Sequence, residues 1–189
     1  MLTDSMSDIN SLIAEFGQKG GFVGKGCIDR RYIPASEKVV YFYDNFTPLT
    51  GTALEIGSGV IFFHSASELV NQQLGYRFDS DGRIIDGWDN RFVMAVFNDN
   101  PIVIDIEGQG DSILALYGGG DFFPVANTID EFFAAFSIAL KVQYKDFANE
   151  PLNEETLELK SEYIEKISRA LRPVMKHDFI GGFMDFFFG

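Results

Sequence analysis

The sequence contains few of the residues that disulfides and metal centres require. Its 189 residues include one cysteine, Cys27, and two histidines, His64 and His177. A single cysteine excludes an intrachain disulfide, and two isolated histidines do not have the spacing of a structural zinc site. Cys27 and His177 would have to meet in space to act as nucleophile and base, and no local pattern favours this over an inert cysteine. We therefore expect neither metal nor cofactor.

Basic residues are also scarce. Lys and Arg number 15 against 28 Asp and Glu, and the formal net charge is -13. Binding to nucleic acid depends on clustered Lys and Arg that contact phosphates, so this composition argues against a nucleic-acid-binding surface. An acidic surface suits a basic protein partner, whose encounter it would speed, and solubility alone is the alternative explanation.

Long apolar runs are absent as well. No segment approaches the roughly 20 apolar residues of a membrane span. The first 18 residues carry acidic side chains where a secretory signal would carry basic ones. We expect a soluble, cytoplasmic protein without membrane contact.

Apolar residues are nevertheless plentiful, at 46% of the chain with 20 phenylalanines. This length and composition predict one folded domain with a sizeable core built largely on phenyl rings.

Helices are predicted from apolar spacing and capping signals. Residues 8–16 place apolar side chains on one helical face, and the glycine-rich residues 17–26 that follow favour a loop over a phosphate cradle. Residues 34–46 suit a helix or a strand equally. Residues 65–75 and 128–141 each begin with a capping box, Ser65 with Glu68 and Thr128 with Glu131. A last helix is expected from about Glu154 to Leu171, before Pro173.

Strands are predicted in the middle of the chain. Two β-prone runs within residues 53–65 flank Gly57-Ser58-Gly59, which is a hairpin signal. Residues 92–97 and 102–106 read as antiparallel strands, with Pro101 confined to the turn because it has no N–H for a ladder. Residues 112–117 form a third strand, and the glycines at 118–120, with 121–123, are expected to end the sheet.

The chain closes with the phenylalanine-rich segment 177–189. Burying one Phe contributes roughly 1.5–3 kcal/mol, so these rings would not remain solvated. They are expected to dock on the body of the domain, and docking on a partner is the alternative.

Two carboxylates, Asp105 and Glu107, lie two residues apart on one predicted strand, and Asp99 lies in the turn before it. Paired carboxylates support acid–base catalysis only where a pocket raises the pKa of one of them. In residues 102–107 the isoleucines alternate with Val103, Asp105 and Glu107, which favours a solvated strand face over catalysis. A hydrolase using these acids with His64 is the least favoured alternative, and no catalytic residue is predicted.

Trp88 precedes the central strand. A half-buried indole with a bonded N–H is the usual explanation for such a tryptophan, and an anchor for a binding partner is the alternative.

Four segments resemble, in order and spacing, the SUKH superfamily, which includes the fungal SMI/KNR cell-wall regulators. They are "VVYFYDNFTP", "GVIFFHSASELVNQQLGYRF", "GWDNRFVMAVFNDNPIVIDIEG" and "LYGGGDFFPVANTIDEFFAAF", and they lie within residues 36–140. The chain departs from that pattern in "YIPASEKVVYF", which lacks the usual leucine-proline, and in Phe122 and Phe123, which stand where the family's glycine-rich loop often ends in tryptophan.

The resemblance implies an α+β domain with a central, largely antiparallel sheet, helices packed round it and no catalytic centre. We expect this domain to span residues 1–145, with residues 146–189 as a C-terminal helical extension packed on it. Bacterial members of the family are implied to act often as immunity proteins that neutralise toxin domains, many of them nucleases.

The first functional hypothesis is thus a non-enzymatic immunity-like protein that binds a basic toxin domain. The alternative is a regulatory scaffold in cell-envelope or signalling work, in which the phenylalanine-rich end forms a homodimer or docks a partner helix. The expected partner-binding residues are Trp88, Asp99, Asp105, Glu107, Asp121 and Phe122.

Overall fold

The computed structural model describes residues 2–24, 36–107, 110–118 and 120–189. Its strands form one six-stranded antiparallel sheet in sequential order. These strands are β3 (Thr52–Ile56), β4 (Gly59–Phe63), β5 (Arg91–Phe97), β6 (Asn100–Asp105), β7 (Ser112–Leu116) and β8 (Phe122–Ala126). A separate two-stranded sheet pairs β1 (Phe22–Val23) with β2 (Thr47–Pro48). The expected α+β class with a largely antiparallel sheet is confirmed.

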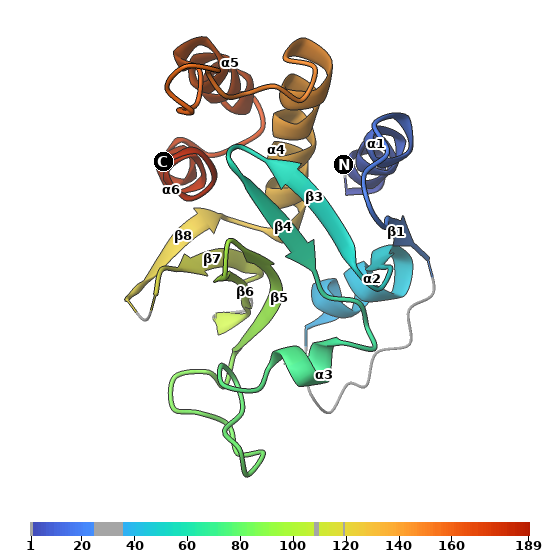
Figure 1. Ribbon diagram of the computed structural model, residues 1–189. Helices are drawn as coiled ribbons and strands as arrows, with labels where there is room; N and C mark the ends of the chain where they lie inside the picture. The colour runs from blue at the N-terminus through green and yellow to red at the C-terminus, as the bar shows by residue number, and fades with distance from the viewer. Residues whose placement is uncertain (1, 25–35, 108–109, 119) are drawn as a thin grey trace.

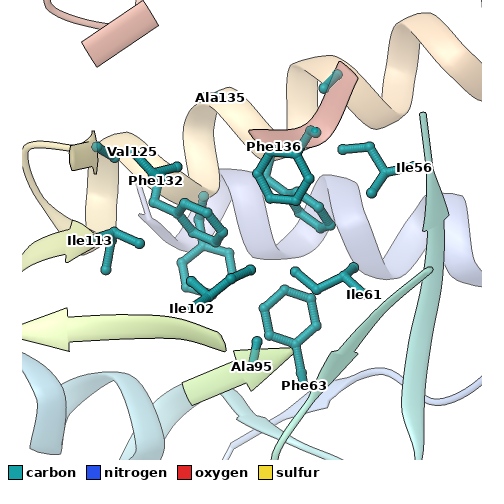
Figure 2. Packing of buried hydrophobic residues seen from close by; sticks show 14 of the residues in the cluster. Ile56, Ile61, Phe63, Ala95, Ile102, Ile113, Val125, Phe132, Ala135 and Phe136 are labelled. Carbon is teal, nitrogen blue, oxygen red and sulfur yellow. The ribbon is translucent and has the colours of Figure 1, made fainter. Parts of the chain in front are cut away.

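The helices pack mainly on one face of the sheet, which we call the inner face (Figure 1). They are α1 (Leu2–Glu15), α2 (Glu37–Phe46), α3 (Leu69–Gln72), α4 (Ile129–Lys141), α5 (Ser161–Leu171) and α6 (His177–Phe188), and the π-helix η2 (Val142–Asp146) continues α4. Figure 2 shows Phe132 and Phe136 of α4 directed at Ile61, Phe63 and Ile102 of the sheet. Phenyl rings form a large part of the core, as the phenylalanine content predicts, together with aliphatic side chains.

Both predicted hairpins are present. Gly57 adopts a positive φ of 59° in the β3–β4 turn, and β3 pairs antiparallel with β4. In the β5–β6 turn Asn98 and Asp99 both have positive φ, as a two-residue hairpin loop of the favoured hand requires.

Two details of the sheet differ from the prediction. Pro101 lies inside β6, opposite Val96, and not in the turn. The strand accepts a proline there because the second residue pair from a two-residue turn exchanges no hydrogen bonds. The prediction that the sheet ends at residues 118–123 is wrong, since Phe122–Ala126 form β8. An edge strand tolerates a proline, here Pro124, which propensity counts against a strand.

The N-terminal helix is longer than predicted, and the ambiguous segment near residue 40 is a helix. α1 begins at Leu2, with Leu2, Met6 and Ile9 buried. The Ser36 side chain caps α2 by accepting a hydrogen bond from the Val39 N–H. The Thr128 hydroxyl caps α4 at its predicted start by accepting from the Glu131 N–H, whereas the Glu131 side chain of the predicted capping box accepts from the Lys176 N–H.

The helix predicted over residues 65–75 is reduced to the single turn of α3. Glu68 Oε2 accepts from both the N–H and the hydroxyl of Ser65, so the capping interaction forms only in part. The helix ends at Gln72 because Gln73 turns inward, where its side chain donates to the Val93 carbonyl and accepts from the Val93 N–H.

The start predicted for the last long helix is also wrong. α5 begins at Ser161 and not at Glu154. The Asn153 side chain accepts from the N–H groups of Glu155 and Thr156, a local turn that competes with a helix. Leu157 then adopts a φ of 59° and is 72% exposed, so it belongs neither to the predicted helix nor to the core.

The C-terminal segment docks on the body of the domain. It forms α6, and its rings Phe183, Phe186, Phe187 and Phe188 are buried in the core of this single chain. They are not available as an exposed surface for a homodimer or a partner helix. Close approach depends on Gly182, where a Cβ would collide with the Pro124 carbonyl of β8.

Candidate partner-binding face

The face of the sheet opposite the helices, the outer face, carries a second apolar cluster. Val93 and Val103 pair across β5 and β6 and are fully buried there. Trp88 packs on both valines. Partly buried side chains surround them, namely Tyr76, Ile85, Val96, Leu114 and Phe122. We call this set the outer cluster.

Segment 73–90 contributes Tyr76, Ile85 and Trp88 to the outer cluster, and the buried guanidinium of Arg77 holds the segment in place. Arg77 Nη1 donates to the carbonyls of Trp88, Asp89 and Arg91 at 2.6, 2.8 and 2.7 Å. Burial lowers the pKa of Arg77, and the neighbouring Asp89 charge opposes this shift. Arg77 therefore fixes the end of the segment through its three hydrogen bonds to backbone carbonyls.

Arg91 brings together four of the six predicted partner-binding residues. Its Nε donates to Asp105 Oδ2 at 2.8 Å, and its Nη2 lies 3.8 Å from Glu107 Oε2. The guanidinium also lies over the Phe122 ring, 4.7 Å from its centroid. The Phe122 ring in turn meets Trp88 edge-on at 5.3 Å.

Asp105 and Glu107 do not form the solvated pair that strand alternation predicts. Asp105 is buried, with Oδ1 accepting from the Glu107 N–H and Oδ2 bound to Arg91. Glu107 follows β6 and is exposed. The prediction failed for Asp105 because segment 73–90 covers this end of the outer face, which alternation alone cannot show.

The remaining predicted residues occupy different settings. Trp88 is only 9% exposed, so its indole is more buried than the half-buried side chain expected. Asp99 is exposed in the β5–β6 turn, at the end of the hairpin away from Asp105. Asp121 is exposed just before β8. The Asn100 side chain accepts from the Gly118 N–H, which ties the turn of Asp99 to the loop that leads to Asp121.

His64 lies apart from these carboxylates, at the end of β4. It is 6% exposed, and its Nε2 has no hydrogen-bond partner among the described residues. Burial lowers the pKa of His64 to about 4, against the opposing charge of Glu68, so the imidazole is neutral at neutral pH. The structure does not join His64 to Asp105 or Glu107, as a hydrolase using the three would require.

Sequence reasoning missed Arg77, Gln73 and Arg91, which organise this face. Their roles depend on contacts between segments 11 to 20 residues apart, for which periodicity carries no signal. It also missed Phe62, which is 50% exposed on the outer face of β4. Its alternation with the buried Ile61 and Phe63 was the available signal.

Comparisons with protein-family models, with curated proteins and with solved structures give no match for this chain. Within the described segments, no helix is long and apolar enough to cross a membrane. The same segments contain no group of three His, Cys, Asp or Glu side chains that could hold a metal ion. Cys27 lies outside the described residues.

Proposed function

We propose that this protein is a non-enzymatic module that binds a basic protein partner through the outer face of its sheet. The resemblance to the SUKH superfamily extends the proposal to an immunity-like role, in which the partner is a toxin domain. The two parts rest on different grounds, because the structure supports a binding face and only the resemblance supports a toxin.

The observation that carries the proposal is the excess of acid on the outer face. Asp89, Asp99, Glu107 and Asp121 are exposed around it. Of the arginines nearby, Arg77 binds backbone carbonyls, Arg91 binds Asp105, and the exposed Arg83 is paired with Asp81. The field at this face is therefore negative, as the net charge of -13 predicts for the whole chain.

The geometry around the carboxylates supports binding over catalysis. Asp105 uses one oxygen for Arg91 and the other for a backbone N–H, so it is committed to holding the end of β6. The hollow beside Arg91, about 220 Å³ and lined by Gly87, Asp89, Asn90, Arg91 and Glu107, is shallow and polar. An acid–base pair requires a pocket that shifts the pKa of one carboxyl group.

The test is to capture partners from a lysate of the native host with the tagged protein and to identify them by mass. We expect a basic protein whose association rate falls at least tenfold between low and high salt, because screening removes the steering. An association rate independent of salt would contradict the electrostatic part of the proposal.

A pair of charge variants sharpens this test. Asp99→Asn with Asp121→Asn removes two charges at the outer face, whereas Glu162→Asn with Glu165→Asn removes two exposed charges on α5. The first variant should slow association several-fold more than the second, although both change the net charge equally. Co-expression of the captured partner with and without this protein then tests the immunity role, since growth should depend on the protein being present.

A further inference from the structure

The outer face is covered at only one end, and its other end is apolar. On β3 and β4 the outward side chains include Ala53, Val60 and Phe62, and Phe62 pairs laterally with Ala53 and with Val96 of β5. Phe62 is 50% exposed, and the other three are partly exposed. We call these four residues the apolar strip. Val96 also packs against the outer cluster, so strip and cluster are continuous.

A hollow of about 290 Å³ opens beside the strip. Phe62, Phe63 and Val96 form its apolar walls, and His64, Glu68 and Gln72 contribute its polar groups. His64 is neutral at neutral pH, because burial lowers its pKa to about 4. Among the described residues that line this hollow, Glu68 carries the one charged side chain, and its Oε2 is held in place by the N–H and hydroxyl of Ser65.

The charge round the strip is mainly negative. Glu55 points outward from β3 beside Ala53, and Asp99 lies in the turn that follows β5. Lys19, whose backbone bridges Ala53 at the edge of β3, is a cation in this region, and its side chain lies against Gly51 at the rim of the hollow. In a dimer related by a two-fold axis through the strip, the acids of one copy would face the same acids of the other copy and repel them. A cationic partner has the complementary charge.

We infer that the apolar strip and the hollow beside it are the docking site for the basic partner, and that the hollow receives one of its Lys or Arg side chains. The aliphatic stem of such a side chain packs on Phe62 and Val96 while its charge meets Glu68. The neutral imidazole of His64 adds no repulsion. This inference rests on the proposed function, and it adds the place of contact and the chemistry of the anchoring residue.

Photo-crosslinking separates the inference from the proposal on which it rests. The crosslinking residue p-benzoylphenylalanine replaces Phe62 in one variant and Tyr41 in another, because Tyr41 is equally exposed, at 50%, but lies on α2. Both tagged variants are irradiated in lysate of the native host, and crosslinked peptides are identified by mass. We expect a basic protein crosslinked from position 62 and not from position 41, through a peptide containing Lys or Arg.

The other outcomes are distinguishable. If the tag captures a basic protein that does not crosslink from position 62, the docking site is wrong and the proposed function stands. If neither variant captures a basic protein, the proposed function fails and the docking site with it. A crosslink from position 62 to a second copy of this chain would also overturn the inference.

Affinity measurements on the captured partner test the anchoring residue. Phe62→Ser should weaken binding at least tenfold, and Tyr41→Ser should leave it within twofold. Glu68→Gln keeps an acceptor for Ser65 but removes the charge, and should weaken binding at least threefold. A circular dichroism spectrum and a thermal midpoint that match those of the wild type establish that each variant is folded. Folded Phe62→Ser and Glu68→Gln variants with unchanged affinity would overturn the inference.

Discussion

His64 is a residue at which burial and charge oppose each other. It lies at the end of β4 with 6% of its surface exposed, and Glu68 is close enough to raise its pKa. The net effect is nevertheless a pKa lowered to about 4, because removing the imidazole from water penalises its charged form more strongly. Between about pH 4 and 6.5 the folded protein therefore holds His64 neutral, whereas the unfolded chain would protonate it.

This difference predicts a loss of stability in mild acid. The folded pKa of His64 lies below the unfolded value, so its unfavourable contribution is absent above about pH 6.5 and grows as the pH falls toward 4. Relative to pH 7.5, the contribution of His64 at pH 5 is a destabilisation of about 2 kcal/mol. Urea unfolding of the wild type and of His64→Gln at both pH values measures it as the difference between the two proteins.

The control is His177→Gln, because the side chain of His177 is 99% exposed. This variant should keep the wild-type dependence on pH, whereas His64→Gln should lose the His64 part of it. Equal losses of stability in wild type and His64→Gln between pH 7.5 and 5 would contradict the prediction.

At the scale of elements, the packing of α6 on β8 depends on one of two adjacent glycines. A Cβ at Gly182 would collide with the Pro124 carbonyl, whereas a Cβ at Gly181 would meet nothing within 4 Å. Gly182→Ala should therefore destabilise the protein by about 1–3 kcal/mol through overpacking. Gly181→Ala should stabilise it by about 0.5–1 kcal/mol, since alanine favours the helix. Chemical denaturation measures the change in the free energy of unfolding of each variant. A change of the same sign in both variants would show that α6 lies differently on the sheet.

Segment 73–90 is a second element whose order depends on one side chain. Arg77→Met keeps much of the aliphatic bulk but leaves the carbonyls of Trp88, Asp89 and Arg91 without their donor. We expect faster amide hydrogen exchange across residues 79–90 and a Trp88 fluorescence spectrum shifted to the red.

Arg83→Met is the control for this prediction, because Arg83 lies in the same segment with 76% of its side chain exposed, paired with Asp81. Exchange and fluorescence in that variant should match the wild type. An unchanged exchange pattern in a folded Arg77→Met variant would show that the outer cluster holds the segment without the hydrogen bonds of Arg77.

At the scale of the whole molecule, the C-terminal helix belongs to the same core as the sheet. Phe183, Phe187 and Phe188 are buried, and the Lys176 N–H donates to Glu131 of α4 at 3.0 Å. Burying each ring contributes roughly 1.5–3 kcal/mol, and a domain is stable by about 5–15 kcal/mol in total. A chain ending at residue 176 should therefore show no cooperative thermal unfolding by circular dichroism.

Replacing the exposed Leu157 with Ser serves as the comparison for truncation, and it should unfold cooperatively near the wild-type temperature. Cooperative unfolding of the truncated chain would mean that residues 1–176 form a complete domain and that α6 is an attachment to it.

Local patterns in the sequence predicted much of the fold. Alternation, the turn signal at Gly57 and the turn that holds Asp99 located four strands, because side-chain period and turn conformation are set by neighbouring residues. The capping box at Thr128 located the start of α4 for the same reason. The edge strand β8 and the late start of α5 were missed, since packing against α6 and a side-chain turn at Asn153 override local propensity there.

The candidate site was predicted in composition but not in arrangement. The sequence by itself determined an acidic, phenylalanine-rich chain of helices and strands with little cysteine or histidine, because composition and short-range periodicity depend on no distant contact. Only the tertiary structure decided that Asp105 is buried against Arg91, that Trp88 is buried in the outer cluster, and that Phe62 is exposed. These outcomes depend on which segments cover which end of the sheet, and that coverage is a property of the packed molecule.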